Sequence, residues 1–371
     1  MPAPAGCLAL HPSGIGATNK VTGLAGHYCI VSAHSLEGSV VQVINLNTGE
    51  VTQRLDLPQH IVLHGITTGE DSTLFLQLEA IGGSRSIAEV PIAEVSTFAL
   101  DTDAPYHVET VWATSEDGTR VPMRIVRDHG TPPQRDARVL LSVYGGYAVP
   151  FVTTGYSSWH KAWLEQGGVL AYAGVRGGGE LGEAWHQAAR KERKRNGILD
   201  LIACARWFET EEWSSPKRVA INGMSNGGLI TAAALVAEPT LFGAVITEVP
   251  VIDMLNFHRY TAAHGWIAEY GDPETEDREY LRAYSPLHNV HHDKEYAPTL
   301  ILTADKDDRV PPAPHAYPFA VELRNTIRGE RSYLKVTYDA GHASGRSLHD
   351  AIDERSAVLA FAQWGIESSH Q

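Results

Sequence analysis

Two patterns of hydrophobic positions follow one another along the chain, and the change between them lies near residue 105. Before it, short β-rich segments alternate with polar turns; they are HYCIVSAH (27–34), SVVQVINL (39–46), EVTQRLDL (50–57) and STLFLQLE (72–79). Turns about every 10 residues between such segments predict antiparallel β-structure of the sandwich, barrel or propeller type.

The length of this first region can be compared with the length of a β-propeller. One blade takes roughly 40–45 residues and four strands, so residues 1–104 hold material for about two blades. A closed propeller needs roughly four to eight blades. The sequence therefore predicts a partial, propeller-like β-region over residues 1–104.

From residue 105 onward the pattern is that of an α/β protein. A hairpin is predicted over 107–126, turning at Asp117-Gly118. The predicted strands that follow are RVLLSVY (138–144), GVLAYAGV (168–175), RVAIN (218–222), GAVITEV (243–249), PTLILTAD (298–305) and SYLKVTYD (332–339), and helices are predicted near 159–166, 198–212, 228–237, 314–327 and 350–365. Strands this hydrophobic are covered on both faces, which predicts a doubly wound, mostly parallel sheet over residues 105–371.

Charge and composition narrow the range of partners. The formal net charge of −14 argues against nucleic-acid binding and gives no signal for a membrane surface. One basic run, RKERKR (190–195), departs from this trend, and we interpret it as a solvated helix face or loop. The His-rich stretch HNVHHDKE (288–295) lacks metal-ligand spacing and is interpreted as an exposed loop. We expect neither a metal nor a cofactor.

The number of cysteines and the N-terminal sequence indicate the cellular compartment. Three cysteines (Cys7, Cys29 and Cys204) in 371 residues do not form a disulfide framework and fit a reducing cytoplasm. The opening MPAPAGCLALHPSG has no basic segment followed by an apolar one, as a signal peptide would have. No apolar run approaches the roughly 18–20 residues of a membrane span. These features predict a cytoplasmic protein.

The stretch NGMSNGG (222–228) is the first candidate for chemistry. Ser225 lies in a G-x-S-x-G pattern between the predicted strand 218–222 and the Ala-rich helix 228–237. A strand, a tight glycine turn and a helix are the context of a nucleophile elbow, whereas G-x-S-x-G alone is also common in ordinary turns. A serine hydroxyl needs a base, usually a histidine that a carboxylate orients.

Both partners follow in the order Ser, acid, His that α/β-hydrolases use. The strand 298–305 runs into an acidic loop that offers Asp305, Asp307 and Asp308, and the strand 332–339 runs into a loop with His342. Acidic turns and histidines are common here, so each feature alone is weak, but the ordered conjunction predicts a Ser-Asp-His triad. The spacing does not choose among the three aspartates.

A rival motif lies upstream in GVRGGGELGEAWH (174–186). Gly177, Gly179 and Gly182 form a G-x-G-x-x-G after a strand, a pattern typical of dinucleotide binding. We reject that interpretation because Glu180 and Glu183 would lie where a pyrophosphate should be, and because the strand is not the first of the sheet. We expect a flexible loop near the site instead.

From about residue 105 to its end, the chain resembles the prolyl oligopeptidase family of serine peptidases. The shared stretches are YGGY (144–147), RGGGELGEAWH (176–186), SPKRVAINGMSNGGL (215–229), FHRYTAAHGWIAEYG (257–271), YSPLHNV (284–290), LTADKDDRVPP (302–312) and AGHASGR (340–346). The resemblance implies that Asp307 is the acid of the triad. It also implies an oxyanion hole made by the Tyr144 hydroxyl and the Asn226 backbone N–H.

The same resemblance implies an apolar, aromatic pocket for the ring of a proline that precedes the cleaved bond. It assigns Trp266 as the stacking surface, with the other pocket positions at Tyr270, Val251, Val310 and Tyr147. Arg309 corresponds to an arginine that binds a substrate carbonyl. An ordinary core role for Trp266, and a salt bridge from Arg309 to Asp308 or Asp305, are the alternatives.

The expected function is a serine endopeptidase that cleaves oligopeptides after proline, with no nucleic-acid or membrane partner. Alternatives are a peptidase of another specificity, a macrocyclase, an esterase, or an inactive remnant. The chain departs from the family in having material for only about two blades of the propeller. Exposed strand edges on such a region predict self-association.

Overall fold

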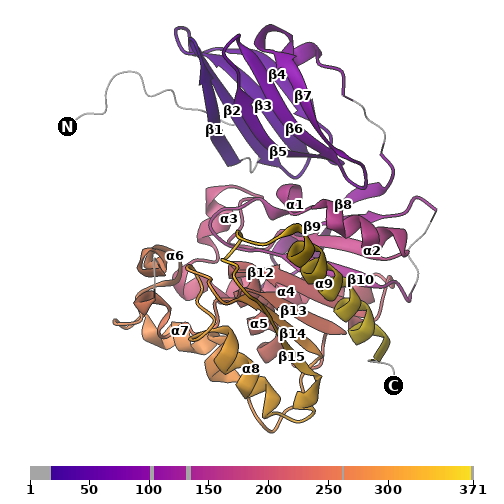
Figure 1. Ribbon diagram of the computed structural model, residues 1–371, viewed down its shortest axis with the longest axis vertical. Helices are drawn as coiled ribbons and strands as arrows, with labels where there is room; N and C mark the ends of the chain where they lie inside the picture. The colour runs from indigo at the N-terminus through magenta and orange to yellow at the C-terminus, as the bar shows by residue number, and fades with distance from the viewer. Residues whose placement is uncertain (1–17, 101–103, 131–134, 261–262, 369–371) are drawn as a thin grey trace.

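The structure, a computed structural model, describes residues 18–100, 104–130, 135–260 and 263–368. The N-terminal segment inspected for a targeting signal, and Cys7 within it, lie outside these ranges. Two regions follow each other in Figure 1: antiparallel sheets in indigo to violet, and a larger α/β region in magenta to yellow.

The N-terminal β-region consists of two antiparallel sheets. The first has the order β1-β2-β3-β4 and the second the order β5-β6-β7. The strands are β1 (Thr18–Ala25), β2 (Tyr28–Ser35), β3 (Gly38–Asn45), β4 (Val51–Leu57), β5 (Ile61–Thr68), β6 (Thr73–Ala80) and β7 (Arg85–Pro91). The predicted antiparallel β-structure is confirmed, and the first sheet has the four strands of a propeller blade.

One hydrophobic core joins these two sheets. Ile30 and Val41 of the first sheet and Leu74 and Leu76 of the second are all buried in it. The helical turn Ile92–Thr97, which follows β7, joins the second sheet to the first. Its Ser96 side chain accepts a hydrogen bond from the backbone of Arg54 on β4 (2.9 Å). The two sheets therefore form one packed unit.

An eight-stranded sheet forms the centre of the α/β region, with the order β15-β14-β13-β12-β10-β11-β9-β8. Its strands are β8 (His107–Thr114), β9 (Arg120–Arg127), β10 (Val139–Val143), β11 (Val169–Ala173), β12 (Val219–Met224), β13 (Ala244–Glu248), β14 (Thr299–Ala304) and β15 (Ser332–Thr337). The strands from β10 to β15 are parallel, and the predicted hairpin β8–β9 pairs antiparallel with β11. The doubly wound, mostly parallel sheet predicted for this region, which is the sheet of an α/β-hydrolase fold, is confirmed.

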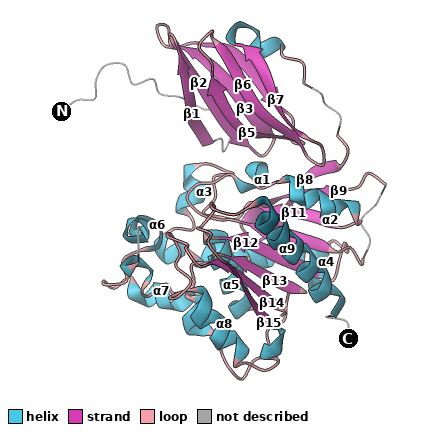
Figure 2. Ribbon diagram, in the orientation of Figure 1, coloured by secondary structure: helices cyan, strands magenta, loops and turns pink. Residues whose placement is uncertain are grey.

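Helices cover both faces of this sheet (Figure 2). They are α1 (Phe151–Thr154), α2 (Lys161–Glu165), α3 (Glu183–Gln187), α4 (Arg195–Thr210), α5 (Asn226–Ala237), α6 (Ile267–Tyr270), α7 (Arg278–Tyr284), α8 (Ala316–Arg324) and α9 (Leu348–Ser368). Within the described ranges, none of the helices combines the length and the apolar composition needed to cross a bilayer.

Neighbouring residues on β10 show why these strands are hydrophobic throughout. Leu141 packs in the core that α4 and α5 cover, together with Leu201 and Ile230. Leu140 faces the other way and packs with Trp163 of α2 and Val358 of α9. Successive side chains of a strand point to opposite faces, so a sheet covered on both sides requires apolar residues at every position.

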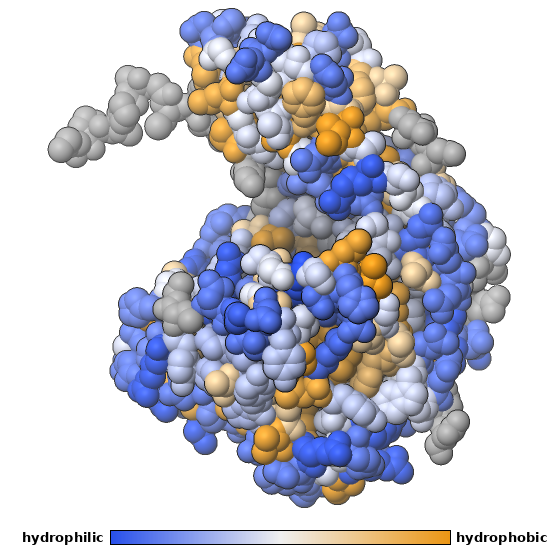
Figure 3. All heavy atoms as spheres, viewed as in Figure 1, coloured by the Kyte–Doolittle hydropathy of each residue, from blue (hydrophilic) through white to orange (hydrophobic). Residues whose placement is uncertain are grey.

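Polar and apolar contacts connect the β-region to the α/β region. Arg124 on β9 is only 1% exposed, and its guanidinium donates to the carbonyls of Leu36 (2.8 Å) and Gln59 (3.4 Å). Val62 and Ile81 of the β-region belong to the same hydrophobic cluster as Leu140. On the face drawn in Figure 3, the molecular surface is hollowed between the two regions.

Candidate functional site

Ser225 occupies the sharp turn between β12 and α5. Its φ of 58° and ψ of −113° are strained values for a residue with a side chain. Its backbone N–H donates to the carbonyl of Glu248 at the end of β13 (2.8 Å). The predicted strand–turn–helix context is present, and the serine side chain is partly exposed.

The glycines around Ser225 are required by close backbone contacts. A Cβ atom on Gly223 would lie 2.3 Å from the carbonyl oxygen of Gly227, and a Cβ on Gly227 would lie 2.3 Å from that of Val143. A Cβ on Gly228 would lie 2.7 Å from Pro250. No larger residue fits at these positions unless the strand and helix move apart.

Asp307 and His342 meet in loops that follow β14 and β15. His342 Nδ1 lies 2.8 Å from Oδ2 of Asp307, and both side chains are buried. The other carboxylate oxygen of Asp307 accepts the backbone N–H groups of Arg309 (2.9 Å) and Val310 (2.8 Å). Because a carboxylate only accepts hydrogen bonds, His342 carries its proton on Nδ1, which leaves Nε2 for a second partner.

Ser225 and His342 lie at the same edge of the sheet, because both follow the carboxyl ends of parallel strands. In the part of the chain that the structure describes, no hydrogen bond joins their side chains. Hydrogen bonds between catalytic groups are often long or absent without substrate and shorten when it binds. The structure thus brings Asp307 and His342 into contact and places Ser225 at the same edge of the sheet.

The two residues assigned to an oxyanion hole flank the serine turn. The Asn226 side chain donates to the backbone carbonyl of Tyr144 and accepts from the Tyr270 hydroxyl (3.0 Å). Burial raises the pKa of the Tyr144 hydroxyl, and nearby Glu269 raises it further, whereas Arg309 opposes the shift. Tyr144 is therefore a protonated donor at neutral pH.

A buried ionic cluster that sequence analysis missed lies beneath the 144–147 loop. Lys194 is fully buried and donates to Glu269 (3.0 Å), which also lies 2.8 Å from Nε2 of His186. Burial opposes ionisation of Glu269, but Lys194 and His186 outweigh it and lower its pKa. Glu269 also accepts the backbone N–H of Tyr147 (3.4 Å), so the cluster ties that loop to α6.

The interpretation of the basic run 190–195 as solvated is wrong for Lys194. The side chain of Arg190 also approaches Glu269, at 3.7 Å. A buried cation is stable here because an acidic group, 75 positions away along the chain, is buried with it. A single sequence gives no signal for such a pairing.

Aromatic rings gather at the position assigned to the proline pocket. Trp266 stacks on Phe257 (centroids 6.5 Å apart, planes at 14°) and meets Tyr270 edge-on (6.5 Å). Tyr147 contacts Tyr270 edge-on at 6.1 Å. Phe257 belongs to the same cluster, although sequence analysis did not assign it to the pocket.

The remaining predicted pocket residues differ in exposure. Val251 and Val310 are buried, Trp266 is half-buried, and Tyr147 and Arg309 are exposed. Arg309 lies in the same loop as Asp307, whose carboxylate accepts its backbone N–H. The buried valines can only form the floor of such a pocket.

The glycine-rich loop after β11 is packed rather than open. Residues 174–180 are all buried, and a Cβ on Gly177 would lie 2.5 Å from the carbonyl oxygen of Gly145. Glu180 accepts the backbone N–H of Val152 (3.2 Å), and burial raises its pKa to about 7. The loop therefore supports the neighbouring 144–152 segment and leaves no space for a pyrophosphate.

The His-rich stretch is exposed over residues 291–294, as predicted. Within the described ranges, no group of three or more His, Cys, Asp or Glu side chains is arranged to hold a metal ion.

Comparisons with known proteins agree with this architecture. The family model of the prolyl oligopeptidase family matches residues 155–369. A prolyl endopeptidase of Elizabethkingia miricola is 36% identical over 268 residues, and prolyl oligopeptidase A of Amanita bisporigera is 38% identical over 262 residues. These matches cover 71% and 69% of the chain, but only 38% and 34% of the relatives' own length.

Solved structures give the same result. A prolyl endopeptidase structure studied for inter-domain dynamics in catalysis and specificity matches with a TM-score of 0.86 and 32% identity, over 96% of this chain and 54% of that one. Prolyl oligopeptidase B of Galerina marginata, bound to a 25-residue macrocyclization substrate, matches with a TM-score of 0.84 and 29% identity, over 96% of this chain and 51% of that one. With the family model matching more than half of its residues, the chain belongs to the prolyl oligopeptidase family.

Proposed function

We propose that the chain is a serine endopeptidase that hydrolyses oligopeptides on the carboxyl side of proline. The observation that carries this proposal is the buried Asp307–His342 hydrogen bond, located at the same sheet edge as the strained turn of Ser225. Family membership and the prolyl endopeptidases among the relatives support it.

In the proposed mechanism, His342 Nε2 takes the proton of Ser225 as the serine oxygen attacks the carbonyl carbon of the scissile bond. Asp307 keeps the Nδ1 proton in place and stabilises the imidazolium ion that forms. The proton then passes to the leaving amine, and an acyl-enzyme remains. A water molecule, activated by His342, releases the peptide acid and restores the serine.

Two donors would stabilise the negative oxygen of each tetrahedral intermediate: the Tyr144 hydroxyl and the backbone N–H of Asn226. The raised pKa of Tyr144 keeps its proton available. One well-placed donor of this kind contributes about 3–4 kcal/mol to transition-state stabilisation. The side-chain bonds of Asn226 to Tyr144 and Tyr270 hold the two donors in a fixed relation.

Preference for proline would come from the aromatic cluster. The flat indole of Trp266, supported from behind by Phe257, suits a rigid apolar ring that loses no rotamer freedom on binding. A pocket for a basic side chain would need a free carboxylate. Glu269, which precedes Tyr270 in the chain, is already paired with Lys194 and His186.

The test combines a fluorophosphonate probe with three chromogenic substrates: a Gly-Pro peptide, a peptide ending in arginine, and a small ester. The proposal predicts labelling and preferred cleavage after proline, both lost in Ser225→Ala and both retained in Ser86→Ala, which alters an exposed serine of β7. Faster cleavage after arginine would refute the proline preference. Ester turnover alone would identify an esterase, and absence of labelling in a folded protein would identify an inactive chain.

A further inference from the structure

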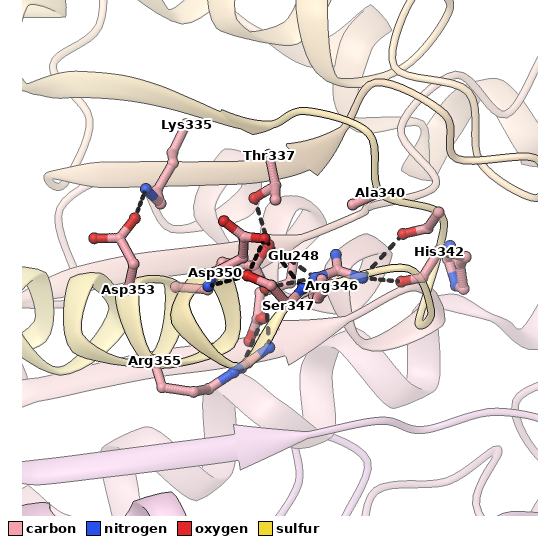
Figure 4. A network of polar contacts seen from close by, with 12 residues as sticks. Glu248, Lys335, Thr337, Ala340, His342, Arg346, Ser347, Asp350, Asp353 and Arg355 are labelled. Carbon is pink, nitrogen blue, oxygen red and sulfur yellow. Dashed lines mark hydrogen bonds and ion pairs between the residues drawn. The ribbon is translucent and has the colours of Figure 1, made fainter.

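The loop between β15 and α9 carries both His342 and Arg346, and the Arg346 side chain binds the backbone of this loop. Arg346 Nη1 donates to the carbonyl of Gly341 (2.9 Å) and makes a longer bond to that of His342 (3.5 Å). These carbonyls belong to the two peptide units on either side of the histidine Cα. A single guanidinium therefore contacts the backbone on both sides of His342 (Figure 4).

Arg346 is itself anchored on α9. Its Nε lies 2.8 and 2.7 Å from the two carboxylate oxygens of Glu354, whose side chain is 4% exposed. The Thr337 hydroxyl at the end of β15 donates to the same carboxylate. Charge-assisted bonds between a planar guanidinium and a buried carboxylate fix both position and orientation.

The next residue of α9, Arg355, contacts the end of β13. Arg355 Nη1 lies 2.8 Å from Oε2 of Glu248, and the backbone carbonyl of Glu248 accepts the N–H of Ser225 (2.8 Å). Two neighbouring side chains of α9 therefore act on the site. Glu354 holds the His342 loop through Arg346, and Arg355 holds the end of β13, whose last residue bonds the backbone of Ser225 (Figure 4).

Other hydrogen bonds hold the residues on either side of His342: the carbonyl of Ala340 accepts the backbone N–H of Lys306 (3.1 Å), and the N–H of Gly341 donates to the carbonyl of Ser344 (2.9 Å). Within the described loop, Arg346 is the side chain that bonds the carbonyls of Gly341 and His342 themselves. Residues 343–345 are exposed, and Gly345 has a φ of 79°. The Asp307 bond controls one atom of the imidazole, but the position of Nε2 also depends on the backbone that carries the ring. An error of about 1 Å in such a group can cost roughly 100-fold in rate.

We propose that Arg346, anchored by Glu354, is a positioning residue that fixes the backbone at His342 so that its ring can serve Ser225 while bonded to Asp307. This inference rests on the proposed peptidase function. Arg346 acts only through His342 and does not touch the reacting atoms.

The primary test is Arg346→Met, with Lys335→Met as the matched control. Lys335 pairs with Asp353 (2.5 Å), so the control also removes a cation that joins β15 to α9, without touching the loop. For Arg346→Met we expect kcat and the rate of fluorophosphonate labelling to fall together by about 10–100-fold, with KM changed by less than about twofold. The control should retain both rates, and Arg346→Lys, which keeps the charge but loses the planar fork, should lie between.

Hydrogen–deuterium exchange of residues 338–347 provides a readout that does not depend on turnover. We expect faster exchange in Arg346→Met and in Glu354→Gln than in the wild type or in Lys335→Met. The inference is overturned if Arg346→Met labels within about twofold of the wild-type rate, or if Lys335→Met loses as much as Arg346→Met. Should the wild type neither label nor turn over substrate, the proposed function fails, and the exchange comparison alone decides the role of Arg346.

Discussion

His342 Nδ1 lies 2.8 Å from Asp307 Oδ2, in a bond that buries both side chains. The adjacent Asp308 is exposed. The loop after β14 therefore presents one carboxylate inward and the next outward.

This difference predicts unequal effects of two isosteric substitutions. Asp307→Asn keeps an oxygen for the N–H groups of Arg309 and Val310, but it would place an amide donor against His342 and favour the wrong tautomer. We expect kcat to fall by about 10³–10⁴-fold. Asp308→Asn should change kcat by less than about threefold, and steady-state kinetics on the Gly-Pro peptide compares the two. A larger loss in Asp308→Asn would show that the acid of the triad lies one residue later.

Tyr144→Phe removes one hydroxyl from the proposed oxyanion hole. If this hydroxyl donates to the developing negative charge, kcat should fall by about 10²–10³-fold with little change in KM. Phenylalanine keeps the ring that stacks on Phe151 (6.4 Å between ring centroids), and circular dichroism would verify that the overall fold persists. Unchanged turnover would limit Tyr144 to a packing role.

Trp266→Ala tests the aromatic pocket. Loss of one stacking surface should reduce cleavage after proline by about 10–200-fold relative to hydrolysis of a small ester. The ratio of the two kcat/KM values cancels general effects on folding and on the triad. Equal losses on both substrates would mean that Trp266 supports the fold and does not select proline.

Acid stability depends on the buried His315. Burial lowers its pKa from 6.5 to about 4, against the opposing effect of Asp253 and Asp307. Between these values the unfolded state binds more protons than the folded state, so stability is lost as the pH falls from about 6.5 to 4, by up to about 1.4 kcal/mol per pH unit.

The measurement is the free energy of unfolding in denaturant at pH 7 and pH 5, for the wild type and His315→Asn. Asparagine offers an acceptor for the backbone N–H groups of Ile252 and Asp253, which His315 Nδ1 accepts at 3.2 and 3.1 Å. The variant should lose less stability between the two pH values. His160, whose pKa burial lowers to about 3, contributes equally to both proteins and cancels. Parallel pH profiles would contradict the assignment.

The apolar pattern of each strand decides whether the sequence could predict it. The central strands of the α/β sheet were all predicted, because burial on both faces requires continuous apolar residues. The strands missed in the β-region are β1, β5 and β7, and each lies at a sheet edge, although the edge strand β4 was predicted. Edge strands need fewer apolar residues, and in β5 the register shifts between Leu63 and Gly65, which breaks the alternation.

The residues of the candidate site also fall into those that the sequence could predict and those that it could not. Ser225 and His342 follow strand ends in a recognisable order, so local pattern is sufficient to propose them. Lys194, Glu269 and Arg346 depend on partners far away in the chain or on contacts with backbone carbonyls. Such contacts leave no periodic trace in a sequence, so only the folded structure could reveal them.

The contact of Arg124 with the N-terminal β-region matters for anyone who wishes to produce the α/β region alone. A shortened chain that starts at residue 105 would lose the Leu36 and Gln59 carbonyls that accept from this guanidinium. It would also lose Val62 and Ile81 from the cluster that contains Leu140 and Tyr172. Apolar surface would then face water, and poor solubility of the fragment should be expected. A usable expression boundary must therefore retain both sheets, or the newly exposed surface must be redesigned with polar residues.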